Sequence, residues 1–342
     1  DNEVEYFVEV GSDYNFDGFR VDHVDHIVDA VSEESGRPIS YRAPRKVLGM
    51  VNTALKQKIP YFGTLAEYML WENFFKEYHN DMNFDLLWGS DIVSQYQKTC
   101  DQIVKDSEFL AEYNLQLAEG EPRLSILKAY NNQDGEFRAI DQYPGQLGAE
   151  GALFKWFKFK FIPAGKYAQR PVLFIDGDES FTQEGIEAAI GAEESMPREK
   201  DYEFFRKFDA INRFALNNNL TRYGIAEITQ PDEEKNGFVT WQIKYENPEI
   251  DDTRLFIVAN QLPPSEKVRI HQPDGSSEVQ IITGKTIYNK TAVIPEGFKV
   301  VAEYVLPENS LEFEERPIEI TSKIHYDKLN PSEFKIYKLS KI

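Results

Sequence analysis

The chain has 342 residues, of which 41% are hydrophobic, so it can bury enough apolar surface for about two domains and is neither disordered nor fibrous. Its 38 basic and 58 acidic residues give a formal net charge of −20, which argues against nucleic-acid partners and against binding to an anionic membrane. Cys100 is the only cysteine, which excludes an internal disulfide and a metal cluster built on thiolates.

Helix and strand patterns alternate before residue 225. Apolar residues that recur every three or four positions predict helices, and short apolar runs between them predict strands. In chain order we expect a helix over 3–14 that stops at Gly11, a strand over 19–21, a loop and short helix through 30–31, and a helix from Pro38 to Ala54. Strands over 59–67 and 84–88 follow, then a helical region over 91–118, a strand over 124–130, a helix over 153–161 with one apolar face, and a strand over 171–179. The last predicted element of this part is an amphipathic helix over 201–216 that buries Phe204, Phe205, Phe208, Ile211 and Phe214. This alternation predicts an α/β fold with a parallel sheet and helical crossovers.

The pattern changes at about Ile225. Short β-rich runs are now separated by turn clusters such as Pro273-Asp274-Gly275, and no helix-length periodicity intervenes. The expected strands are 239–245, 255–259, 268–270, 279–282 and 298–304. Residues 225–342 are therefore predicted to form an antiparallel β domain behind an α/β part over residues 1–224.

A short stretch near the start carries the first candidate site residues. In Gly18-Phe19-Arg20-Val21-Asp22 an apolar run ends in charged residues, as happens where a buried parallel strand opens into a loop. Arg20 and Asp22 alternate along one face of this strand, so the guanidinium can hold the carboxylate ionised and oriented. Such a carboxylate is suited to act as a nucleophile or as an electrostatic stabiliser. The alternative interpretation is a purely structural ion pair.

With His26 four residues after Asp22, this stretch resembles the nucleophile strand of the α-amylase family of glycoside hydrolases and transglycosidases. Further stretches that are similar to the family's motifs follow in the family's order: the strand that ends at Glu67, the segment Asn132-Gln133-Asp134 where the family has a motif ending Asn-His-Asp, Phe174 to Glu179 for the last barrel strand, and Phe204 to Gly224 for the last barrel helix. The resemblance covers about residues 3 to 260.

The resemblance implies a (β/α)8 TIM barrel followed by an antiparallel β-sandwich domain. Only about strands four to eight have counterparts, so residues 1–224 would be the C-terminal portion of the catalytic barrel and residues 225–342 the C-terminal β domain. A half barrel exposes sheet edges and an apolar floor, and the chain begins with Asp1 rather than Met. We therefore expect one piece of a longer polypeptide, with the missing N-terminal barrel portion either on another chain or absent from this sequence.

The family's chemistry is a double displacement on an α-glucan or α-glucoside, with an oligo- or polysaccharide as substrate. Retention takes two carboxyl groups about 5 to 5.5 Å apart. By resemblance Asp22 is the nucleophile, Glu67 is the acid and then the base, and Asp134 stabilises the distorted ring. Glu72 is an alternative to Glu67.

Four more residues are expected to contact the substrate or hold the nucleophile. Arg20 orients Asp22, and His26 corresponds to a family histidine that lines the sugar subsites. Gln133 stands in place of a histidine, and its amide can still donate a hydrogen bond to a sugar hydroxyl. Tyr68 is an aromatic residue near a strand end that can stack on a sugar face. The other such aromatics are Trp71, Trp88 and Tyr143, and core packing is the alternative for each.

Water, a sugar hydroxyl or phosphate can accept the glycosyl group, and hydrolysis is the preferred expectation. The rival function is a catalytically impaired carbohydrate-binding or scaffold protein, which Gln133, Asp25 in place of a common lysine, and the missing early motif favour. Calcium is common in the family, but its usual ligands come from the part without counterpart, so no metal site is assigned. His79, His271 and His325 lack ligand spacing and are expected at the surface. The sequence contains no run of 18 apolar residues, so it predicts no membrane-spanning helix.

Overall fold

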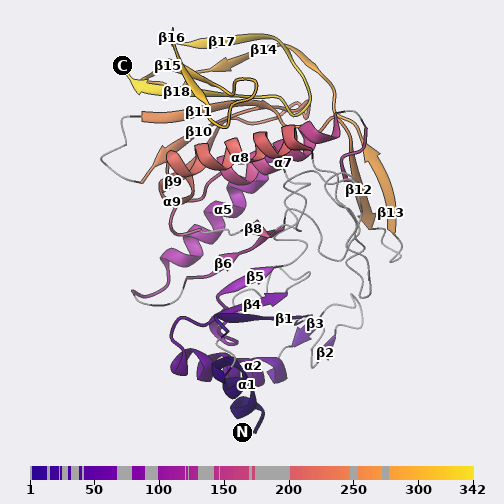
Figure 1. Cartoon of the computed structure of the whole chain (residues 1–342), viewed down its shortest axis with the longest axis vertical. Helices are drawn as coiled ribbons and strands as arrows, with labels where there is room; N and C mark the ends of the chain where they lie inside the picture. The colour runs from indigo at the N-terminus through magenta and orange to yellow at the C-terminus, as the bar shows by residue number, and fades with distance from the viewer. Residues whose placement is uncertain are drawn as a thin grey trace. The chain divides into compact units, whose positions relative to one another are not determined.

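A computed structural model describes residues 2–13, 16–22, 24, 30–31, 38–40, 42–67, 79–88, 99–119, 121, 123–129, 142–145, 147–168, 172–173, 201–246, 253–271 and 277–342 (Figure 1). Contacts within the chain divide it into two compact units. The first unit comprises Asp1–Gln95, Phe109–Ala129 and Tyr167–Pro171, and the second comprises Tyr96–Glu108, Tyr130–Lys166 and Val172–Ile342. The predicted domain boundary after residue 224 stays a prediction.

The first unit contains a four-stranded parallel sheet. Its strands, in spatial order, are β1 (Gly18–Val21), β4 (Gly63–Glu67), β5 (Leu86–Trp88) and β6 (Ser125–Ile126). Spatial order follows chain order, and the helix α2 (Arg42–Lys58) lies between β1 and β4 in the chain. A parallel pair requires such a crossover because the chain must return to the starting edge of the sheet. The prediction of a parallel α/β sheet is confirmed.

The segment between β1 and α2 differs from the prediction. Ala30–Val31 forms β2 and Pro38–Ser40 forms β3, and the two pair as an antiparallel ladder. The expected short helix at 30–31 and the helix start at Pro38 are therefore wrong. Pro38 lacks a backbone N–H donor, but the first residue of an edge strand does not need one. The helix α2 begins only after β3, at Arg42.

Close packing explains a second difference, at Gly11. The helix α1 (Asn2–Asp13) continues through this glycine instead of stopping there. A Cβ atom at Gly11 would lie 3.0 Å from Leu55 Cδ2 and 3.4 Å from Phe62 Cε2. The missing side chain therefore allows α1 to approach α2. Leu55, Phe62 and Val51 form a buried cluster, against which Phe19 packs.

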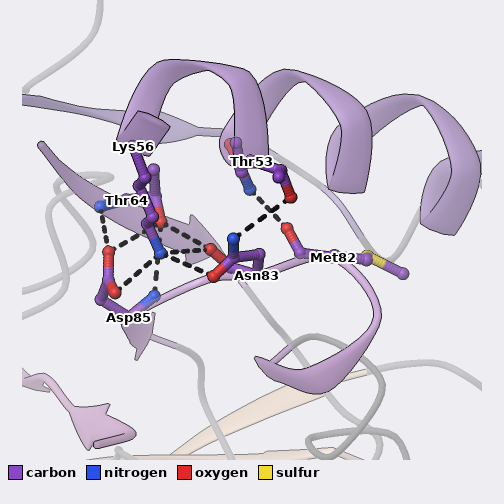
Figure 2. A network of polar contacts seen from close by, with 7 residues as sticks. Thr53, Lys56, Thr64, Met82, Asn83 and Asp85 are labelled. Atoms are coloured by element: carbon purple, nitrogen blue, oxygen red, sulfur yellow. Dashed lines mark hydrogen bonds and ion pairs between the residues drawn. The ribbon is translucent and has the colours of Figure 1, made fainter. Parts of the chain in front are cut away.

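A polar network joins α2 to the amino-terminal ends of β4 and β5 (Figure 2). Lys56 Nζ lies 2.8 Å from Asp85 Oδ1 and donates to the Asn83 carbonyl at 2.6 Å. The other oxygen of Asp85 accepts from the backbone N–H and the hydroxyl of Thr64, at 2.9 and 3.0 Å. Nearby, Asn52 Nδ2 donates to the Met82 carbonyl at 2.7 Å. Because Asp85 precedes β5 and Thr64 lies in β4, these bonds set the register of the two strands.

The remaining elements before the antiparallel sheet follow the predicted pattern with shifted bounds. They are α5 (Cys100–Leu115), β7 (Lys128–Ala129), α7 (Gly148–Phe161), β8 (Val172–Leu173), α8 (Tyr202–Asn217) and α9 (Leu220–Tyr223). Asp201 caps α8 by accepting the Phe204 N–H at 2.9 Å. Phe205 is 44% exposed, so its predicted burial is wrong: it lies one position, or about 100°, from the stripe of Phe204, Phe208 and Ile211.

The helix α7 is buried on all sides, not on one apolar face. Lys155 and Lys158 are among its buried residues. Lys155 Nζ donates to Gln142 Oε1 at 3.1 Å, and Gln142 Nε2 donates to Glu266 Oε1 at 3.0 Å. Burial of a lysine needs such partners, and the sequence of the helix alone does not reveal them.

The second unit contains a six-stranded sheet with antiparallel neighbours. Its spatial order is β16 (Glu314–Ile320), β15 (Phe298–Val305), β18 (Phe334–Lys341), β11 (Thr253–Asn260), β10 (Phe238–Tyr245) and β9 (Gly224–Gln230). Two further antiparallel pairs are β12 (Glu266–His271) with β13 (Ser277–Ile282), and β14 (Ile287–Val293) with β17 (Lys323–Leu329). The predicted antiparallel β part is confirmed.

Both faces of this sheet are covered. Leu255 and Ile257 of β11 join the aromatic cluster of α7 and α8, whereas Phe256 and Val258 join a cluster with residues of β14 and β17. Figure 1 shows α7 and α8 on one side of the sheet and β14 and β17 on the other. Alternate side chains of a strand point to opposite faces, so β11 is apolar from Leu255 to Ala259. No described helix has the length and apolar character needed to cross a membrane.

Candidate active site

Three neighbouring parallel strands bring the candidate residues to one edge of the sheet. Asp22 follows β1 directly, Glu67 ends β4, and Trp88 ends β5. The register pairs Val21 with Ala66, and Glu67 with Trp88. The carboxyl ends of parallel strands therefore coincide here, which is the edge where α/β barrels carry their catalytic residues.

Arg20 contacts both predicted carboxylates. Its Nη2 atom lies 2.8 Å from Glu67 Oε2 and forms a second ion pair with Asp22 Oδ1. Because one nitrogen contacts both oxygens, those oxygens lie no further apart than two hydrogen-bond lengths, about 6 Å. The sequence predicted the Arg20–Asp22 pair, and the structure adds Glu67 to it.

The two carboxylates differ in their exposure. The side chain of Asp22 is 65% exposed, whereas that of Glu67 is 2% exposed. A buried carboxylate needs a counter-charge or hydrogen-bond donors, and the Arg20 guanidinium supplies both to Glu67. Asp22 is open to an incoming ligand.

Trp88 lies under the same guanidinium. The Arg20 Cζ atom is 4.7 Å from the centroid of the Trp88 ring, which is the distance of a cation–π contact. Trp88 is only 6% exposed, so its ring packs on Arg20 and is not available to stack on a sugar. Tyr143 is also buried, at 3% exposure, and its hydroxyl lies 3.5 Å from Glu266 Oε1. The sugar-stacking interpretation is therefore wrong for both rings.

The other predicted site residues lie outside the described part of the chain. These are His26, Tyr68, Gln133 and Asp134, together with the alternative Glu72 and the neighbouring His23, Asp25 and Trp71. Their roles stay predictions.

One histidine prediction is wrong. His79 is buried, and its Nδ1 atom lies 2.8 Å from the Tyr113 hydroxyl. That hydroxyl donates in turn to Asn80 Oδ1 at 2.9 Å. The His79 ring thus takes part in the packing of the first unit. His325 is exposed as predicted, with its Nε2 atom 3.4 Å from Asp327 Oδ1.

A second cluster of ionisable groups lies within the second unit. Burial raises the pKa of Glu266, and the nearby charges of Lys158 and Lys155 act against that rise. Burial also raises the pKa of the Cys100 thiol to about 12, so this cysteine is protonated at neutral pH and is no nucleophile. Sequence patterns did not indicate the cluster of Glu266, Lys155 and Lys158, because Glu266 is distant in the chain from the two lysines.

The second unit also has a cleft of about 330 Å³. Side chains of α7 and α8 line it together with residues of β15 and β18, among them Leu153, Ile211, Tyr304 and Phe334. No predicted site residue lines this cleft. Among the described residues, no group of three or more His, Cys, Asp or Glu side chains could hold a metal ion, so these residues assign no calcium site.

No family model and no curated protein matches the sequence. The fold of the chain, however, is similar to that of solved structures. An α-amylase from Anoxybacillus superposes with a TM-score of 0.53 at 15% identity, over 99% of this chain and 63% of that chain. A maltogenic α-amylase from Thermotoga neapolitana gives a TM-score of 0.54 at 12% identity, over 99% and 66%. A cyclomaltodextrinase gives 0.56 at 12% identity, over 98% and 47%.

This chain thus spans 63% of the length of the Anoxybacillus enzyme. At these identities the similarity concerns the fold, to which the parallel sheet, the antiparallel β part and their order along the chain all contribute. The fold of this chain is thus similar to that of the corresponding part of α-amylase family glycoside hydrolases.

Proposed function

We propose that this chain carries catalytic residues of a retaining glycoside hydrolase or transglycosidase that acts on α-glucans or α-glucosides by double displacement. The observation that carries the proposal is the Arg20 bridge between Asp22 and Glu67, at the carboxyl ends of adjacent parallel strands. Since the solved structures of similar fold include amylases and a cyclomaltodextrinase, we take an oligo- or polysaccharide as the substrate class.

The spacing of the two carboxylates supports retention. Oxygens that share one guanidinium nitrogen lie within about 6 Å of each other, and a retaining pair needs about 5 to 5.5 Å between its carboxyl groups. An inverting pair is set wider to admit a water molecule. In our proposal the exposed Asp22 attacks the anomeric carbon and forms a covalent β-glycosyl intermediate.

Glu67 then has two tasks that need opposite charge states. It must carry a proton in the first step, to give it to the leaving oxygen, and must be ionised in the second, to activate the acceptor. The ion pair with Arg20 stabilises the ionised form, so the observed arrangement suits the second step. In the first step Arg20 must act mainly on Asp22, which has to be ionised to attack.

The rest of the family assignment is part of the same proposal. The order β1, β4, β5, β6 agrees with four consecutive strands of a barrel, which we number four to seven. By that numbering Asp134 follows strand seven and would brace the distorted sugar ring, with His26, Gln133 and Tyr68 as further substrate contacts. The earlier barrel strands would come from another chain or from a part of the polypeptide outside this sequence.

The rival proposal is a carbohydrate-binding or scaffold protein without turnover. Gln133 in place of a histidine favours it, because a neutral amide cannot supply a positive charge to the substrate. The same ion pair between Arg20 and Glu67 would then be a structural element. Binding of maltooligosaccharides without any product would be its signature.

Incubation with maltooligosaccharides and with sucrose, followed by chromatography of the sugars, separates the two proposals. Shortened or extended sugars support the enzyme, and Asp22→Asn should abolish their formation. A fluorinated glucosyl donor that traps the covalent intermediate should label Asp22, as peptide mass mapping would detect. Products that persist at the parent level in Asp22→Asn would overturn the assignment of the nucleophile. Calorimetric binding without products would favour the scaffold.

A further inference from the structure

We propose that Trp88 is a positioning residue whose ring holds the Arg20 guanidinium in the plane that bridges Asp22 and Glu67. This inference deepens the proposed function and rests on it. In this role Trp88 acts through Arg20, over whose guanidinium its ring lies.

The strand order explains how the contact arises. β4 lies between β1 and β5, and neighbouring strands are about 4.8 Å apart. Arg20 leaves β1, contacts Glu67 at the end of β4, and reaches the ring of Trp88 at the end of β5. Glu67 and Trp88 are direct partners in the parallel ladder, so their side chains leave the sheet at the same level and on the same side.

Burial indicates that the ring serves the arginine. Trp88 is 6% exposed, while the side chain of Arg20 retains 30% of its exposure. A guanidinium 4.7 Å from an indole centroid gains from the ring quadrupole, and this gain grows as water is excluded from the ring face. An arginine side chain has many rotamers, so a flat partner that restricts them favours simultaneous contact with two carboxylates.

The charge of the site depends on this restriction. Of the described residues, Asp22 just after β1 and Glu67 on β4 are the charged groups in ion pairs with Arg20, and β5 contributes the uncharged ring of Trp88. Without the ring, Arg20 can follow the exposed Asp22 toward solvent and leave Glu67. The buried Glu67 would then lose the charge of Arg20 and become harder to ionise.

Trp88→Leu tests the inference against Trp88→Phe, which keeps a ring face. We expect Trp88→Leu to lower kcat/KM by about 10- to 100-fold, because a small misplacement of a charged group costs up to that much. The alkaline limb of its kcat/KM profile, which reports loss of the proton from Glu67, should move upward, since an arginine neighbour lowers a carboxyl pKa by about 1 to 3 units. Trp88→Phe should recover most of both. Leu87→Val, a truncation of the buried neighbour on β5, should leave the alkaline limb in place.

A double-variant cycle with Arg20→Lys tests whether Trp88 acts through the arginine. If it does, adding Trp88→Leu to Arg20→Lys should change kcat/KM by less than about 3-fold, because coupled residues are not additive. Additive losses would overturn the inference, as would an unmoved alkaline limb in Trp88→Leu.

Carbon-13 NMR titration of the Asp22 and Glu67 carboxyl groups gives a readout without turnover. A higher titration midpoint for Glu67 in Trp88→Leu, but not in Trp88→Phe or Leu87→Val, supports the inference even when the parent chain is inactive, in which case only the proposed function fails. Equal midpoints in the parent and Trp88→Leu overturn the inference whether or not the parent turns over a sugar.

Discussion

Arg20 Nη2 lies 2.8 Å from Glu67 Oε2, across two adjacent parallel strands. Glu67 is almost fully buried, so this contact supplies the counter-charge that its carboxylate needs in the folded state. The consequences for stability can be measured independently of any activity.

We expect Arg20→Met to destabilise the fold by about 3 kcal/mol, because it removes the guanidinium that pairs with a buried carboxylate. This value is at the low end for buried pairs since Arg20 is 30% exposed. Urea unfolding followed by circular dichroism measures the change. In the double variant Arg20→Met/Glu67→Gln most of the loss should be regained, because no charge remains buried. A double variant as unstable as the single one would contradict this account.

The network of Lys56 and Asp85 gives a second prediction. Asp85→Ala removes one acceptor of Lys56 Nζ and the acceptor of two Thr64 donors, so the cost should be about 3 kcal/mol. The exposed pair of Lys299 and Glu319, with Glu319 67% exposed, is the matched control. Glu319→Ala should cost less than about 1 kcal/mol. Equal shifts of the urea midpoint in Asp85→Ala and Glu319→Ala would show that the network does not stabilise the pairing of β4 with β5.

Glu266 should make the stability of the second unit depend on pH. Burial raises its pKa in the folded state, so the folded protein binds this proton more tightly than the unfolded chain does. Stability therefore falls as the pH rises from the ordinary glutamate value of about 4.3 through the folded value. Glu266→Gln should flatten this part of the melting temperature curve, whereas Glu278→Gln at an exposed position should not. An unchanged slope in Glu266→Gln would contradict the prediction.

Glu203 should act in the opposite direction. A hydrogen bond from Arg206 lowers the pKa of Glu203 to about 2, so its contribution is present above the ordinary value and is lost as the pH falls toward 2. The side chain is 51% exposed, and solvent screening limits the contribution to about 0.5 kcal/mol. NMR titration of the Glu203 carboxyl group in the parent and in Arg206→Met measures the effect. A low midpoint that survives in Arg206→Met would identify another cause.

The sequence predicted the parts of the site that depend on local pattern. Phe19 and Val21 indicated a buried strand, the charges after them marked its end, and a second apolar run placed Glu67 at the end of β4. The partner of Glu67 was not predictable. It depends on the lateral order of β1 and β4, and a linear pattern does not encode which strands are neighbours.

The errors have similar causes. A lysine such as Lys155 is expected at the surface from the sequence. Its burial is explained only by Gln142 and Glu266, which come from distant segments. Sugar stacking and core packing were both left open for Trp88, because its position at a strand end is the same for both roles. The strands β9, β14, β16, β17 and β18 were not predicted individually. β16 shows why, because its pattern Glu-Glu-Arg-Pro-Ile-Glu-Ile is mostly exposed at the edge of the sheet and gives little apolar signal.

The position of β18 has a consequence for biosynthesis. This strand, the last one described, lies in the interior of the six-stranded sheet and pairs with both β15 and β11. Ile336 enters the cluster of α7 and α8, while Tyr337 and Leu339 enter the opposite cluster. Until Lys341 has left the ribosome, the nascent chain therefore displays two unpaired strand edges and two incomplete apolar surfaces, which expose it to mispairing and aggregation during this interval.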